Sequence, residues 1–209
     1  MRRGSGGAGY GRRLALLALV WGVVLLWSGW APYDRATWWM EVAPVLIALP
    51  VLVATRARLP LTGLALGLIG AHGLVLMLGG AYTYARVPVG YEVQAWLGLA
   101  RNPYDRFGHL MQGFVPAIVL REVAIRTGAL RAGMFLSITV VAWCLAISAA
   151  YELVEFGAAI ALGQGADAFL GTQGDPGDTQ WDMLMCLVGA TLALLLLSRI
   201  HDRAIERAR

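Results

Sequence analysis

Long apolar runs separated by short polar segments set the pattern of this chain. Six runs stand out, at about 14–30, 38–54, 61–81, 105–125, 132–158 and 181–200. Several approach or exceed the roughly 18 apolar residues that indicate a membrane-spanning helix. The alternating segments of about 10 residues typical of a membrane β-barrel are missing from the pattern. The sequence therefore predicts an all-α, polytopic transmembrane bundle of six spans. Residues 14–200 form one domain, between basic tails at 1–13 and 201–209.

The connections refine this picture. A basic start before an apolar run also suits a signal peptide, but the run 14–30 ends in Trp-Ser-Gly-Trp-Ala-Pro, a poor cleavage site, so we expect a retained anchor. Residues 82–104 are mixed in character and predict a loop with a short interfacial helix. The third span carries Gly63, Gly67, Gly70 and Gly73, a spacing that lets helices approach closely. We expect spans three to six to form a tight core and the first two to pack peripherally.

The arginines predict the orientation in the membrane. With six spans, 13 of the 17 basic residues fall in the two tails and in the second-to-third and fourth-to-fifth connections. The opposite side holds Arg35, Arg86, Arg101 and Arg106. The positive-inside rule then places both termini in the cytoplasm. Most acidic residues lie at the other ends of the spans, which are expected to face outward.

Composition excludes several classes of protein. The chain is 58% hydrophobic and only 14% charged, against about a quarter charged in soluble domains. Its net charge of +4 comes from arginines at span ends, so nucleic acid is not an expected partner. The expected surroundings are the lipid bilayer of the bacterial inner membrane. Cys144 and Cys186 both lie in apolar runs and are expected to be packing residues rather than a disulfide.

Ionisable residues gather where three spans reach the outer face. Asp105 and His109 are four apart at the start of the fourth span, which puts them on one helix face. Glu152 and Glu155 end the fifth span. Asp178 and Asp182 open the sixth, inside the polar stretch Gly-Thr-Gln-Gly-Asp-Pro-Gly-Asp-Thr-Gln-Trp-Asp-Met at 171–183. Buried ionisable groups in a membrane usually face the bundle interior or a water cavity, so we expect these side chains to converge.

Carboxylates with a histidine suit a divalent metal ion as well as general acid–base chemistry. The predicted catalytic residues are Asp105, His109, Glu152, Glu155 and Asp182. The sequence does not identify a cofactor, and a divalent metal ion is one candidate. Its candidate ligands are Asp105, His109, Glu155 and Asp178. Residues expected to contact substrate or to support these groups are His72, Asp175, Arg101 and Arg106. The 171–183 stretch would act as a lid.

A structural interpretation stands beside the functional one. Asp105, Asp178 and Asp182 suit helix starts as caps and dipole partners. Arg101 and Arg106 could pair with Glu152 or Glu155 and hold the helices together. Capping does not explain glutamates at the end of a helix, where the dipole disfavours negative charge. Glu122, near Arg121 and Arg126 at the inner face, is interpreted as part of an interfacial ion pair.

Four segments carry a resemblance to a known family: GGAYTYARVP (79–88), RNPYDRFGHLMQGF (101–114), SAAYELVEF (148–156) and FLGTQGDPGDTQWDM (169–183). They resemble the YjdF-type family of uncharacterised bacterial inner-membrane proteins, which implies no activity. A more distant similarity links the chain to VanZ-like membrane proteins, associated with glycopeptide resistance. Asp105, His109, Glu152, Asp182 and Gly189 fit that pattern. Glu155 replaces its Gln and Cys186 its Asn.

Three functions stay open on the sequence. The first is an outward-facing enzyme or binding site, metal-assisted or acid–base, for an envelope lipid or cell-wall precursor. The second is a small cation or proton transporter. Its pathway looks broken, because only His72 and Glu122 lie below the outer groups. The third is a structural or partner-binding membrane protein whose carboxylates pair with arginines.

Overall fold

The computed structural model describes residues 5–162 and 173–208, and the only regular secondary structure in this part of the chain is helical, without strands. The helices are α1 (Ser5–Trp30), α2 (Arg35–Thr55), α3 (Gly63–Tyr82), α4 (Pro88–Leu97), α5 (Tyr104–Thr127), α6 (Met134–Leu162) and α8 (Asp178–Arg207). The all-α membrane fold is thus confirmed, as is a short helix within 82–104. The polar stretch begins outside the described residues, at 171 and 172.

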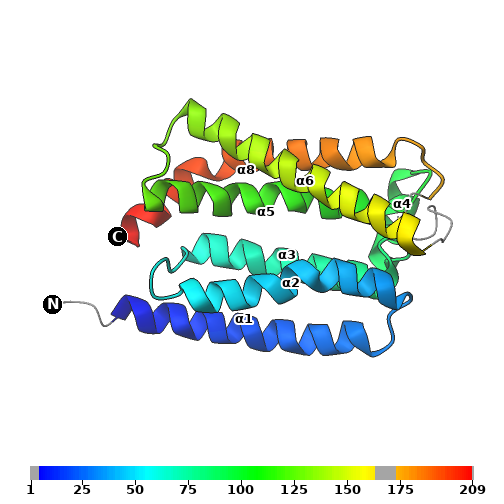
Figure 1. Ribbon diagram of the computed structural model, residues 1–209, viewed down its shortest axis with the longest axis horizontal. Helices are drawn as coiled ribbons and strands as arrows, with labels where there is room; N and C mark the ends of the chain where they lie inside the picture. Colours follow the sequence, from blue (N-terminus) through cyan, green and yellow to red (C-terminus); the bar gives the residue numbers. More distant parts are fainter. Residues whose placement is uncertain (1–4, 163–172, 209) are drawn as a thin grey trace.

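Five of these helices, α1, α2, α3, α6 and α8, are long and apolar enough to cross a bilayer. Helix α5 is equally long and runs beside them (Figure 1). Its ionisable residues, buried within the bundle, account for its lower hydropathy: Asp105, His109, Arg121 and Glu122. Six crossings and the orientation of the termini stay predictions.

The helices form two layers (Figure 1). Helices α1, α2 and α3 make one layer, and α5, α6 and α8 make the other. Helix α3 packs on α5 and joins the layers, while α4 lies across one end of the bundle. Helix α1 begins and α8 ends at the opposite end. Helix α2 packs more extensively on α3 than α1 does. The second span is therefore less peripheral than expected.

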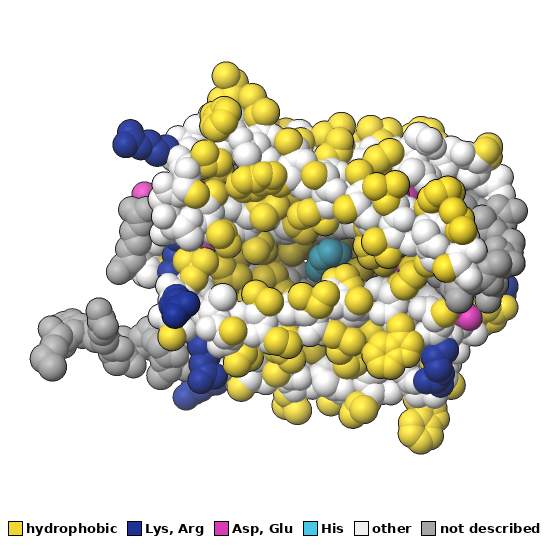
Figure 2. Space-filling model, in the orientation of Figure 1, with side chains coloured by type: hydrophobic (Ala, Val, Ile, Leu, Met, Phe, Trp, Pro, Cys, Tyr) yellow, Lys and Arg dark blue, Asp and Glu magenta, His cyan; other side chains and the backbone are white. Residues whose placement is uncertain are grey.

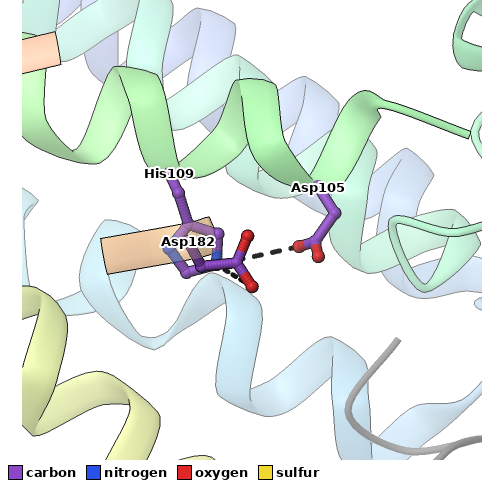
Figure 3. Close-up of side chains that lie close together, drawn as sticks. All are labelled: Asp105, His109 and Asp182. Atoms are coloured by element: carbon purple, nitrogen blue, oxygen red, sulfur yellow. Dashed lines mark ion pairs between the residues drawn. The ribbon is translucent and has the colours of Figure 1, made fainter. Parts of the chain in front are cut away.

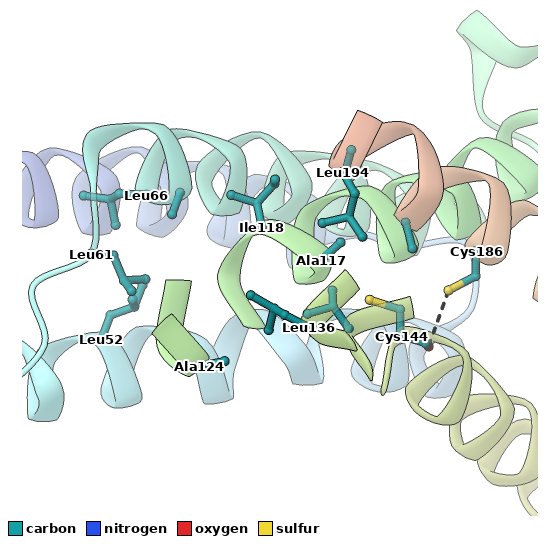
Figure 4. Packing of buried hydrophobic residues seen from close by; sticks show 14 of the residues in the cluster. Leu52, Leu61, Leu66, Ala117, Ile118, Ala124, Leu136, Cys144, Cys186 and Leu194 are labelled. Atoms are coloured by element: carbon teal, nitrogen blue, oxygen red, sulfur yellow. Dashed lines mark hydrogen bonds between the residues drawn. The ribbon is translucent and has the colours of Figure 1, made fainter. Parts of the chain in front are cut away.

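The closest helix contact is between α5 and α8, where two glycines replace side chains. A Cβ on Gly113 would lie within 2 Å of the Cys186 carbonyl oxygen, and one on Gly189 would lie 2.0 Å from that of Leu110. Cys144 packs beside this seam and its carbonyl accepts from the Cys186 thiol at 3.4 Å (Figure 4). Both cysteines are free and buried, as expected of packing residues.

The glycines of the third span behave differently from the prediction. Gly67 has open space where its Cβ would be, so it makes no close helix contact. Gly73 does make a close helix contact, because the indole of Trp21 in α1 occupies the space where a Cβ of Gly73 would be. The same indole donates a hydrogen bond to the Gly70 carbonyl at 3.1 Å. A regular spacing of small residues indicates a helix face that can pack closely. Which of its glycines makes the close contact depends on the side chains of the neighbouring helix.

A buried polar network closes the end of the bundle opposite α4. The Glu122 carboxylate accepts from the amide and hydroxyl of Thr62, both at 2.7 Å, and thereby caps α3. It also pairs with Arg126 at 2.9 Å, and the His201 imidazole lies 3.0 Å away. The predicted Glu122–Arg126 pair is confirmed. Arg121 instead reaches Asp202 of α8 at 2.6 Å, because its side chain faces that helix.

Candidate functional site

The site lies at the α4 end of the bundle, where the start of α5 is firmly anchored. Asn102 is buried, accepts from the Tyr104 amide at 3.0 Å and donates to the Val87 carbonyl at 3.0 Å. Gln173 clamps the Asn102 backbone, accepting from its amide at 3.0 Å and donating to its carbonyl at 3.1 Å. The polar stretch before α8 is therefore held against the first turn of α5.

Three helices bring their ionisable side chains together on one imidazole. His109 Nε2 lies 3.8 Å from Asp105 Oδ1, 3.8 Å from Glu152 Oε1 of α6 and 3.9 Å from Asp182 Oδ2 of α8. Figure 3 shows the Asp182 carboxylate beside His109 and Asp105. All four side chains are at most 11% exposed. We call these four residues the His109 cluster.

The spacing within the His109 cluster is informative. Distances of 3.8–3.9 Å are too long for hydrogen bonds. They match two ligands on a common ion, because metal–ligand bonds of about 2.0–2.2 Å place two ligand atoms no more than roughly 4.4 Å apart. Ligand atoms of Asp105, His109 and Asp182 all lie within 4.8 Å of one another. These three residues have the spacing of a metal site.

Gln112 fixes the orientation of the imidazole. It lies one turn along α5 from His109, and its Oε1 is 2.9 Å from His109 Nδ1. With that oxygen as acceptor, Nδ1 carries the hydrogen and the Nε2 lone pair points toward the three carboxylates. Metal-binding histidines are usually held in this way by a second hydrogen bond. The sequence interpretation did not include Gln112, although its three-residue spacing from His109 was the available signal.

Two carboxylate oxygens of the His109 cluster lack a hydrogen-bond partner. Among the described residues, Glu152 Oε1 and Asp182 Oδ1 are fully buried and accept no hydrogen bond. Glu152 is 8% exposed and Asp182 3%. Burying an uncompensated carboxylate is costly, so a proton or a cation must accompany these groups.

Arginines pair with some of the carboxylates at this end of the bundle, but not with Glu152 or Asp182 among the described residues. Arg106 pairs with Asp175 at 2.7 Å, and Arg101 pairs with Asp178 and lies 3.4 Å from Asp105. The structural interpretation paired Arg101 and Arg106 with Glu152 or Glu155, but the structure pairs them with Asp105, Asp175 and Asp178. Asp178, a predicted metal ligand, is thereby paired with Arg101. Arg106 also stacks on Trp181 at 5.1 Å.

A cavity of about 520 Å³ adjoins the His109 cluster. It runs between the two layers, and Figure 2 shows this hollow on a largely hydrophobic face, with a histidine visible inside it. His72 and Glu155 line the cavity together with Asp105 and His109. The expectation that His72 points toward the site is confirmed. Glu155, a predicted ligand, lies in the cavity wall rather than among the three residues with metal spacing.

Further polar residues line the same end of the cavity: Glu41 of α2, Tyr84 and Tyr151. Sequence reasoning missed all three as site residues, although a glutamate inside an apolar run is itself a signal. Thr83 and Tyr84 both adopt left-handed backbone conformations, with φ of 54° and 49°. This turn folds the Tyr84 ring back against Gly79 and Gly108, which have no Cβ to obstruct it. Burial raises the pKa of Tyr84 well above its usual range, so its phenol stays protonated.

This combination defines a class: a polytopic α-helical membrane protein with a buried carboxylate–imidazole site at one end of its bundle. The family described as "Predicted membrane protein (DUF2238)" matches residues 13–203, and the chain belongs to this family. It is 52% identical over 190 residues to "Inner membrane protein YjdF" of Escherichia coli (strain K12), covering 91% of each chain. No solved structure matches it.

These findings confirm the YjdF-type resemblance and a bacterial inner-membrane location. The more distant similarity to VanZ-like proteins stays a prediction.

Proposed function

We propose that this protein is a metal-dependent membrane enzyme that acts on an envelope lipid or lipid-linked cell-wall precursor at the outer face of the inner membrane. The observation that carries the proposal is the His109 cluster. One imidazole nitrogen faces three carboxylate oxygens at 3.8–3.9 Å, and two buried carboxylate oxygens lack partners among the described residues. A divalent cation would satisfy both features.

Each residue has a role in this proposal. Asp105, His109 and Asp182 would hold the metal ion, and a site that mixes nitrogen and oxygen ligands suits Zn²⁺ or Mn²⁺. Glu152 Oε1 lies 3.8 Å from the same imidazole nitrogen and would serve as the general base, while the metal ion would supply Lewis-acid activation of water. Arg101 and Arg106, with Asp175 and Asp178, hold the segment that begins α8 in position. The chemistry supported best is metal-assisted hydrolysis of a substrate that enters through the adjoining cavity.

The alternative functions fit the described residues less well. A cation pathway needs polar groups across the bilayer, yet apolar side chains line the cavity between the His109 cluster and the far end of the bundle, among them Ala48, Ile69 and Leu120. A purely structural network would pair its central carboxylates. Among the described residues, arginine pairs with Asp105 of the His109 cluster and with Asp175 and Asp178, whereas Glu152 and Asp182 make no ion pair with arginine.

Metal analysis of protein purified in detergent tests the proposal. After incubation with Zn²⁺ or Mn²⁺ and removal of excess, the parent protein should retain about one ion per chain. His109→Ala and Asp182→Asn should lose the ion and stay helical by circular dichroism. Glu92→Gln, at an exposed position on α4, is the matched control and should keep it. At a free metal concentration of about 100 Kd, binding should stabilise the parent by roughly 2.7 kcal/mol. Equal metal content in parent and His109→Ala would refute the site.

A further inference from the structure

The cavity has two chemically distinct parts. Its end beside the His109 cluster carries polar side chains, whereas the rest is lined by aliphatic residues that follow α2, α3 and α5 toward the opposite end: Ala48, Leu52, Ile69, Val119, Leu120 and Val123. A cavity with a polar end and a long apolar section suits an amphiphilic ligand rather than a small soluble molecule.

The dimensions of the cavity limit what fits. Asp105 and Val123 both line it and are about 27 Å apart along α5, from a rise of about 1.5 Å per residue. That length approaches the roughly 30 Å of a bilayer's hydrocarbon core, so an extended hydrocarbon chain matches it.

The cavity is open at its side. Val51 of α2 and Ile147 of α6 line it and are also 53% and 44% exposed on the surface of the bundle. These two helices face the bilayer, so the opening between them faces lipid. A chain can therefore enter without leaving the membrane, which avoids the cost of exposing hydrocarbon to water.

We propose that this cavity binds a single long hydrocarbon chain of a phosphate-bearing membrane lipid, which enters between α2 and α6 and places its phosphate at the His109 cluster. The choice of a phosphate head rests on the proposed metal, because Glu41, Asp105 and Glu155 would repel an anion without a bound cation. The binding of the chain itself rests only on the aliphatic walls, the length of the cavity and the lateral opening.

Photolabelling in vesicles tests this proposal. The probe is a long-chain alkyl phosphate with a diazirine at the end of its chain, and labelled residues are mapped by mass spectrometry. With metal bound, labels should concentrate on deep cavity residues such as Leu120 and Val123. Val115→Phe narrows the cavity about midway between Asp105 and Val123 and should abolish deep labelling. Ile138→Phe, at a position 60% exposed on α6, is the matched control and should leave it intact.

A second probe separates this inference from the metal proposal. The alkyl alcohol of the same chain length carries no charge, so it should label the deep residues of Asp105→Asn, whereas the phosphate should not. Deep labelling by the alcohol in a parent that holds no metal would support the chain site while refuting the metal site. If the metal-loaded parent is labelled only at lipid-facing positions such as Leu195, the proposed chain site is refuted while the metal site stands.

Discussion

At the scale of single residues, one hydrogen bond decides what the site can bind. Gln112 Oε1 lies 2.9 Å from His109 Nδ1, and with that oxygen as the acceptor from a neutral imidazole, Nε2 is the lone-pair nitrogen. In the absence of a cation or proton, this nitrogen would point its lone pair at three carboxylate oxygens, which is an unfavourable arrangement. The orientation of His109 is therefore the most direct link between the structure and the proposed metal ion.

Gln112→Leu tests this link. Leucine keeps an apolar side chain of similar size but removes the acceptor, so the imidazole loses its fixed orientation and tautomer. We expect the affinity for Zn²⁺ to fall about 10–100-fold, the usual cost of removing such a support. Competition with a chelator of known affinity measures it. Gln94→Leu on α4, away from the site, should bind like the parent, and unchanged affinity in Gln112→Leu would exclude a supporting role for this amide.

At the scale of helices, the α5–α8 seam sets the geometry of the site. Asp105 and His109 come from α5 and Asp182 from α8, so the separation of these two backbones controls the ligand distances. Gly113 and Gly189 permit the close approach, because a Cβ at either position would collide with backbone carbonyl oxygen of the other helix. Backbone atoms cannot move aside as a flexible side chain can.

Gly113→Ala should therefore destabilise the protein, and Gly67→Ala provides a matched comparison. Overpacking at Gly113 is expected to cost about 1–3 kcal/mol. Gly67 has open space around its Cβ position, so alanine there should be neutral or stabilising by up to about 1 kcal/mol through helix propensity. Unfolding in detergent, followed by circular dichroism, measures both. Equal stability of the two variants would contradict the close contact.

At the scale of the whole molecule, the two ends of the bundle differ in chemistry. The α4 end holds the His109 cluster, and the opposite end holds the Glu122 network together with the beginning of α1 and the end of α8 (Figure 1). Termini at one end are consistent with an even number of crossings. The arginine distribution favours placing that end in the cytoplasm.

Reporter fusions test this orientation. A phosphatase that is active only outside the cytoplasm should be active when fused after Leu99, between α4 and α5, and inactive when fused after Arg209. A fluorescent protein that folds only in the cytoplasm should give the reverse pattern. Activity of the phosphatase at Arg209 would reverse the proposed topology and place the His109 cluster inside.

The sequence by itself determined the fold class and part of the site. Lengths of apolar runs determined the helical membrane architecture, because an unpaired backbone cannot cross hydrocarbon. Helix periodicity determined that Asp105 and His109 share a face. The sequence also indicated that the ends of three spans would contribute carboxylates to the site, and Glu152 and Asp182 do so.

Tertiary structure alone decided which of the candidates meet. Periodicity shows which residues share a face but not which neighbour that face contacts. Asp178 therefore pairs with Arg101 instead of joining the His109 cluster, and Glu155 lies in the cavity wall. Glu41 enters the cavity because α2 packs on α3, a contact between separate spans that no local pattern encodes. The lateral opening between α2 and α6 likewise exists only once the two layers are assembled.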